Sequence, residues 1–178
     1  MTSYPFPKWR RVPFIAALTI ILVLSYAPSI TRGTVNIRVY AVMPQGPVSH
    51  LYIHTAQIQL HTAGLDPSAG IIFLTPTISR VDLVPALSKP IPTTVLSQTV
   101  TSGRYDSIKI VFSNSTVVLD GQKGTAISSG PTLFANVTIP VPPNGNGDVL
   151  VVLSLDYSLL LLTTPALSAD ILQITAVS

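Results

Sequence analysis

Three histidines are the residues whose type and spacing could hold a metal ion. His50, His54 and His61 are the only histidines of the chain and lie within twelve residues of one another. His50 and His54 would share one face of a regular strand, but a bulge expected before His61 makes that residue harder to align with them. The chain has no cysteine or glutamate to complete a zinc site of the usual kinds. We therefore expect exposed polar residues on a strand, and no metal or cofactor.

Catalysis would require a nucleophile beside a base, or paired carboxylates. The sequence contains no Gly-x-Ser-x-Gly elbow, and its seven acidic residues are all aspartates, scattered singly. Asp66, Asp120 and Asp148 each adjoin a proline or a glycine, where turn formation explains them. The sequence therefore predicts a protein that is not an enzyme.

Oxygen ligands for calcium are spaced along one short segment. Asn144, Asn146 and Asp148 alternate with small residues, as calcium ligands in a loop can do. No further acidic residues cluster nearby, so a hairpin turn is the preferred interpretation of this segment. A calcium-binding module stays open as an alternative.

Two segments fit the acceptor pattern for N-linked glycosylation. They are Asn114-Ser115-Thr116 and Asn136-Val137-Thr138. Asn114 lies beside a predicted hairpin, so we expect it to be modified in preference to Asn136.

The basic residues at the start of the chain account for its net charge of +3. Lys8, Arg10 and Arg11 come before an uncharged apolar stretch, and the rest of the chain has seven basic and seven acidic residues. A nucleic-acid partner would need clustered basic side chains, and none remain, so none is expected. Positive residues before an apolar segment are typical of an export signal.

Residues 1–33 are therefore expected to be a signal peptide or an N-terminal membrane anchor in the form of a hydrophobic helix. Cleavage after Ala27 would leave Pro28 at the new N-terminus, which is unfavourable. Cleavage after Ser29, with Ala27 as the other small residue of the site, is the better candidate. The apolar span up to Ile30 is also just long enough to cross a bilayer. Both outcomes remain open, and both place the rest of the chain outside the cytoplasm, secreted or at the cell surface.

Residues 34–178 are expected to form one all-β domain. Apolar and polar residues alternate in short runs separated by turn residues, and charged residues make up only 10% of the chain. In residues 48–61 the apolar phase shifts from odd to even positions, which predicts a bulge near Thr55 and Ala56. The pattern indicates an antiparallel β-sandwich of about seven to nine strands. The expected strands are residues 34–42, 48–61, 71–74, 78–83, 105–112, 114–119, 132–141, 149–155 and 170–177.

Several of these stretches resemble the extracellular family known as domain of unknown function 4382. The similarity lies in the bulged strand 48–61, the pair Asp82-Leu83, the step Gly103-Arg104-Tyr105 into a strand, and the late segment Leu155-Asp156-Tyr157. It extends over about residues 34–177. The resemblance implies a prealbumin-like (transthyretin-like) β-sandwich at the cell surface, and it implies no activity.

Residues 149–155 are apolar at nearly every position, unlike a strand with one face in water. A central strand covered by a neighbouring loop, a membrane segment and a surface covered by another subunit all fit this pattern. The stretch is continued by residues 159–162, and Asp156 within it argues against the membrane segment.

The leading functional hypothesis is a non-catalytic surface module for adhesion, envelope scaffolding or assembly, with copies of itself or other envelope proteins as partners. One alternative is a filament subunit in which residues 34–42 add as a strand to a neighbour's sheet. The other is a secreted ligand-binding or carbohydrate-binding module.

Overall fold

The computed structural model describes residues 31–42, 47–84, 92–128 and 130–177. All but the last three residues of the predicted leader lie outside these ranges, so the expected N-terminal helix does too. Within the described ranges, no helix is long and apolar enough to cross a bilayer.

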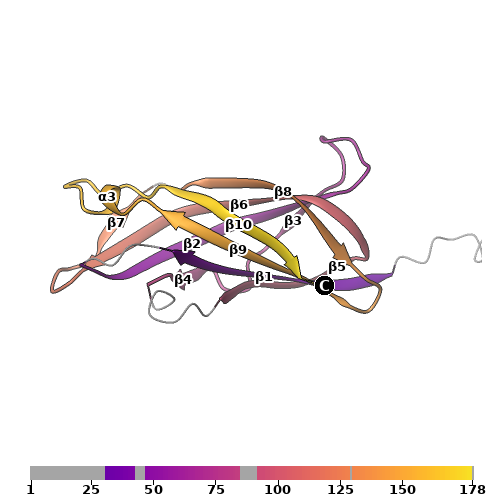
Figure 1. Cartoon of the computed structure of the whole chain (residues 1–178), viewed down its shortest axis with the longest axis horizontal. Coiled ribbons are helices and arrows are strands. Elements are labelled where there is room, and N and C mark those ends of the chain that lie inside the picture. Colours follow the sequence, from indigo (N-terminus) through magenta and orange to yellow (C-terminus); the bar gives the residue numbers. More distant parts are fainter. Residues whose placement is uncertain (1–30, 43–46, 85–91, 129, 178) are drawn as a thin grey trace, which may run out of the picture. The chain divides into compact units, whose positions relative to one another are not determined.

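The described residues form two sheets (Figure 1). Sheet A has the strand order β10-β9-β1-β5. Its members are β10 (Ala169–Val177), β9 (Asn146–Leu155), β1 (Arg32–Val42) and β5 (Thr93–Thr101).

Sheet B is built on two long central strands, β2 and β6. The sheet runs in the order β3-β2-β6-β7, with β4 also paired to β2 and β8 also paired to β6. The strands are β2 (Val48–Thr62), β3 (Ile71–Leu74), β4 (Arg80–Asp82), β6 (Gly103–Leu119), β7 (Thr125–Ile127) and β8 (Thr132–Val141).

Apolar side chains from both sheets form one core. In β1 every second residue is buried, as the alternation in the sequence predicted, and Val35 and Ile37 are fully buried. Leu51 and Ile58 of β2 belong to the same cluster. The all-β prediction is therefore confirmed, with two largely antiparallel sheets enclosing a common core, as a β-sandwich requires.

One strand pair departs from the predicted antiparallel arrangement. β1 is parallel to β9, in register from Thr34 opposite Asn146 to Val42 opposite Ser154. On its other side β1 is antiparallel to β5. A parallel pair needs a long connection, and the whole of sheet B lies between β1 and β9 in the sequence.

The strand β5 was not predicted. Its sequence is rich in threonine, serine and glutamine, which hid the buried residues Val95, Leu96 and Val100. Conversely, the predicted strands 105–112 and 114–119 are one strand, β6, which continues past two exposed residues at Ser113 and Asn114. The described residues contain ten strands, three of them only three or four residues long.

The predicted bulge in β2 is confirmed. The pairing of β2 with β6 shifts on both sides of Thr55, and the buried residues change from Ile53 to Ile58 across it. The side chains that point away from the core are therefore even-numbered before the bulge and odd-numbered after it.

The apolar stretch 149–155 forms the central strand β9 of sheet A. β9 lies between β1 and β10, side by side with both (Figure 1). Val152 is 2% exposed, although it lies on the face away from the main core. The chain then turns through a short helix, α3 (Tyr157–Leu160), whose first turn is capped by Asp156 accepting from the Ser158 amide at 3.0 Å.

Candidate functional site

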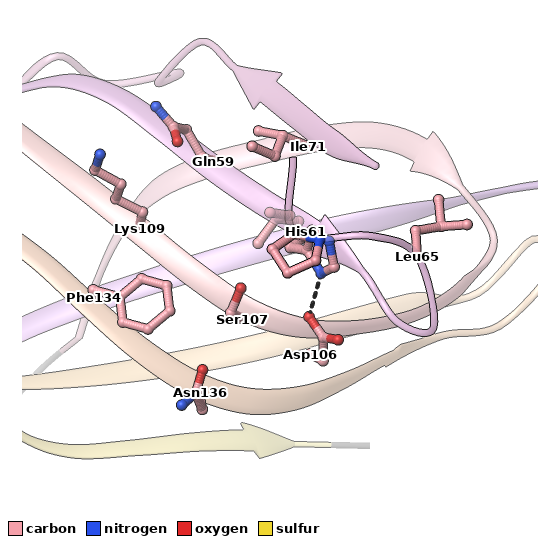
Figure 2. Close-up of a pocket in the computed structure, with 11 residues that line it drawn as sticks. Gln59, His61, Leu65, Ile71, Asp106, Ser107, Lys109, Phe134 and Asn136 are labelled. Atoms are coloured by element: carbon pink, nitrogen blue, oxygen red, sulfur yellow. Dashed lines mark hydrogen bonds and ion pairs between the residues drawn. The ribbon is translucent and has the colours of Figure 1, made fainter. Parts of the chain in front are cut away.

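The outer face of sheet B carries an open groove of about 830 Å³, which we call the sheet-B groove. Its floor is made by β2, β6 and β8, and Leu65 and Ile71 border it at the end of β2 (Figure 2). Both are unusually exposed for large apolar residues. The groove is the strongest candidate for a binding site in the part of the chain that the structure describes.

Strand register places the side chains of the groove in two rows across the sheet. The first row contains Gln59 opposite Lys109, which is in turn opposite Phe134. Phe73 extends this row on the far side of Gln59. Phe73 and Phe134 are each 61% exposed, and three strand spacings separate them by about 14 Å. The row thus has a hydrogen-bonding amide and a positive charge between two exposed aromatic rings.

The second row is more polar and lies beside the first. It contains Ile71, His61, Ser107 and Asn136, again in register across β3, β2, β6 and β8. Figure 2 shows Asn136 on the same strand as Phe134. Hydroxyl, amide and imidazole groups therefore surround a partly apolar depression, which is a combination typical of ligand sites.

His61 is held by two acceptors. Its Nδ1 lies 2.7 Å from an Asp106 carboxylate oxygen, and its Nε2 lies 3.0 Å from the Asp66 carbonyl oxygen (Figure 2 shows the first contact). Only the doubly protonated ring can donate to both. The carbonyl of Asp66 and the carboxylate of Asp106 therefore raise the pKa of His61 above its ordinary value of 6.5. With both nitrogens engaged, the ring can position neighbours but is poorly placed to take up a proton from a substrate.

A second histidine–aspartate pair lies near the other end of β2. His50 Nδ1 is 2.6 Å from Asp82, and the His50 ring stacks on Tyr52 with a centroid distance of 5.5 Å. The guanidinium of Arg80 lies 4.0 Å from the centre of the Tyr52 ring. These four residues come from β2 and β4 and form a surface cluster separate from the sheet-B groove.

The three histidines do not converge. His54 and His61 are seven positions apart on one extended strand, which separates them by roughly 23 Å. His50 lies further from His61 still, and both are paired with carboxylates. Among the described residues, no three histidine, cysteine or acidic side chains come together as metal ligands.

The segment considered for calcium forms a tight turn that connects β8 of sheet B to β9 of sheet A, so the turn is confirmed, but the two strands are not paired as a hairpin. Asn144 adopts the left-handed conformation with φ of 55°, and the Gly145 amide donates to the Pro142 carbonyl at 3.1 Å. Asp148 points to β1, where it accepts from the Asn36 amide at 3.0 Å and lies 3.9 Å from Arg38. Its carboxylate is thus engaged by protein groups.

Both glycosylation candidates are exposed strand residues. Asn114 lies on β6 at its irregularity, and its side-chain carbonyl accepts from the Ser113 hydroxyl at 3.2 Å. Asn136 lies on β8 and lines the sheet-B groove. The sequence favoured Asn114, whereas the pairing of β8 with β6 is what places Asn136 at the groove.

The other groove residues were missed by sequence reasoning. Gln59, Lys109 and Phe134 each occupy an outward position in a predicted strand, where a solvated side chain is unremarkable. Alternation could have assigned each residue to the outer face. It could not show that these three strands are neighbours.

The residues that carry the family resemblance have structural roles. Asp82 accepts hydrogen bonds from the backbone amides of Leu51 and Val84, both at 3.1 Å. Tyr105 is buried, which raises the pKa of its hydroxyl, and that hydroxyl donates to the Thr101 carbonyl at 2.7 Å. No protein-family model, curated protein or solved structure matches the chain. The resemblance therefore stays a prediction that rests on these motifs.

Proposed function

We propose that the chain is an exported, non-catalytic structural module of the cell surface, with a prealbumin-like β-sandwich and residues 1–33 as its signal or anchor. The observation that carries this proposal is the position of β1. The strand that begins at the end of the predicted leader, β1 (Arg32–Val42), is a central strand of sheet A, paired on both sides.

This position suits a domain that is held by its N-terminus. β1 has eight residue pairs in register with β5 and nine with β9. A force applied along β1 loads both ladders together, because their hydrogen bonds run across the strand direction. The side chains of Val35, Ile37 and Val39 are also buried in the core and would have to be withdrawn at the same time. The domain therefore resists extraction of the strand that tethers it.

The first test is the location of the full-length protein in its own cells. A C-terminal epitope tag should be removed by protease added to intact cells, and the tagged chain should fractionate with the envelope or the medium. A full-length chain with a protected tag in the cytoplasmic fraction would overturn the proposal. Substituting His50 and His61 by glutamine should leave the location unchanged, since the proposal assigns export to residues 1–33.

A second candidate function, a filament subunit, is favoured by the same strand. If β1 of one copy filled the position between β5 and β9 of the next copy, the pairing would be identical and the chains would be linked. In this exchange β1 of each copy is absent from its own sheet A, and both of its ladders form with the next copy instead.

A disulfide trap separates the two candidates, because the chain has no cysteine of its own. Asn36 and Ser97 are opposite each other on β1 and β5, and the Ser97 hydroxyl donates to Asn36 at 2.8 Å. Opposed residues of this kind lie within disulfide reach. After oxidation of protein from the cell surface, Asn36→Cys with Ser97→Cys should give covalent monomers. A ladder of covalent oligomers that neither single variant produces would establish strand exchange instead.

A further inference from the structure

Three alternate residues of β8 point out of sheet B at the sheet-B groove or beside it. Phe134, Asn136 and Thr138 are all exposed, while Leu133 and Ile139 are buried on the opposite face. Asn136 and Thr138 are the acceptor and hydroxyl residues of the pattern for N-linked glycosylation. We infer that Asn136 carries an N-linked glycan and that this glycan occupies the sheet-B groove.

The groove provides the contacts that a saccharide requires. Asn136 projects from one side of the floor, and its neighbours in register are Ser107 and then His61. The adjacent row provides Phe134 and Lys109. Hydroxyl and ammonium groups can bond sugar hydroxyls, while the flat aromatic ring accepts the apolar face of a sugar ring. Figure 2 shows the labelled polar side chains surrounding the depression that these residues share.

A covalently attached glycan also accounts for the exposed apolar side chains. Phe134 leaves most of its surface in water in the bare chain, and Ile71 and Leu65 border the same depression. A free saccharide would pay the full cost of losing its translational freedom on binding. A glycan linked to Asn136 meets the groove at a high effective concentration, so weak contacts suffice to hold it there.

The attachment reaction balances with one co-reactant. A lipid-phosphate-linked oligosaccharide, which the host transferase uses after export, provides the sugar. The Asn136 side-chain nitrogen forms a bond to the sugar's anomeric carbon as the bond from that carbon to the lipid-phosphate oxygen breaks. The lipid phosphate leaves as an anion, and the amide nitrogen gives up one proton. No oxidation or reduction takes place.

This inference reverses the preference for Asn114 drawn from the sequence. Asn114 is exposed, but it is not among the residues that line the sheet-B groove. Its side chain instead bonds to the neighbouring Ser113 hydroxyl. Because Asn114 does not line this groove, it serves as the matched comparison for Asn136.

The test begins with glycopeptide mass mapping of the full-length protein purified from the surface of its own cells. We expect a glycan on Asn136, and Thr138→Ala should remove it while leaving the asparagine in place. Asn114→Gln is the matched control and should leave the mass of the Asn136 peptide unchanged. An unmodified Asn136 in exported protein would overturn the inference. Because the inference rests on the proposed export, the location of the protein is measured in the same experiment. A chain found in the cytoplasm would show that the proposed export is wrong, which is distinct from an exported chain without the glycan.

Occupancy of the groove needs its own readout. Trp9, the only tryptophan, lies in the predicted leader and is replaced by phenylalanine, so Phe134→Trp introduces a single reporter in the groove. Acrylamide quenching of that reporter should be roughly twofold weaker with the glycan than in a Phe134→Trp, Thr138→Ala chain. Equal quenching in the two would show that the glycan lies elsewhere and overturn the assignment of the groove. If the attached glycan gives no protection from quenching but added free saccharide protects the reporter in the unglycosylated chain, the groove belongs to a ligand-binding module and the assignment to the glycan is wrong.

Discussion

Both sheets are built from strands with alternating apolar and polar residues, but their outer faces differ in how many large apolar side chains they expose. On sheet A, Asn36 and Arg38 of β1 both contact Asp148 of β9, and Val152 is buried. On sheet B, Phe73 and Phe134 are the most exposed large apolar residues in the described part of the chain. Sheet A is therefore arranged to hold its central strand, whereas sheet B presents a surface that something else can cover. Substitutions should separate these two roles.

The largest expected effect is on β1. Ile37→Ala deletes a fully buried side chain at the centre of sheet A. We expect the free energy of unfolding to fall by about 2–5 kcal/mol, since the cavity adds to the lost burial. Urea denaturation followed by circular dichroism measures it. A loss comparable to that of an exposed residue would break the comparison, because β1 would then contribute little to the fold.

A substitution at the bulge of β2 should change the free energy of unfolding by a smaller amount and should raise it. The Thr55 hydroxyl is buried, and it has no hydrogen-bond partner within the described residues. Thr55→Val removes that hydroxyl while keeping the shape of the side chain, so stability should rise by about 1 kcal/mol. Ser115→Ala is the parallel case, with a second buried hydroxyl of this kind. A loss of stability in the same urea experiment would mean that the hydroxyl has a partner, such as an internal water.

The contribution of His61 to the stability of the fold should depend on pH. Its pKa is raised in the folded state by the Asp66 carbonyl and the Asp106 carboxylate, so the folded chain binds this proton more tightly than the unfolded chain. The stabilisation is then fully present below the ordinary pKa and is lost as pH rises through the folded pKa. The difference in melting temperature between the natural chain and His61→Gln should shrink from pH 5 to pH 9. Asp106→Asn should reduce that pH dependence, and a difference that stays constant with pH would contradict the assignment.

The smallest effect is expected at the groove. Phe134→Ala in unglycosylated protein should change the free energy of unfolding by no more than about 0.5 kcal/mol, because the ring is largely in water. The contrast with Ile37→Ala is the sharpest form of the comparison between the sheets. A loss of several kcal/mol would show that Phe134 belongs to the packed interior and that sheet B has no open surface there.

Much of the fold was predictable because alternation reports which face of a strand a residue takes. The phase change around Thr55 located a bulge, and the Asn144 turn was identified from its turn residues. β5 was missed because its three buried residues, Val95, Leu96 and Val100, do not alternate with polar ones. The break expected within β6 was wrong because Ser113 and Asn114 form a local irregularity that the ladder with β2 spans.

The sequence by itself determined the strand-rich architecture, the faces of most strands and the candidates Asn114 and Asn136. Only the tertiary structure decided that β1 runs parallel to β9, that His61 meets Asp106, and that Asn136 lines a groove with Phe134. The reason is that the face of the sheet to which a side chain points depends on its own strand, where successive residues point to opposite faces. The identity of the neighbouring strand depends on pairing between segments far apart in the chain, and no local pattern records it.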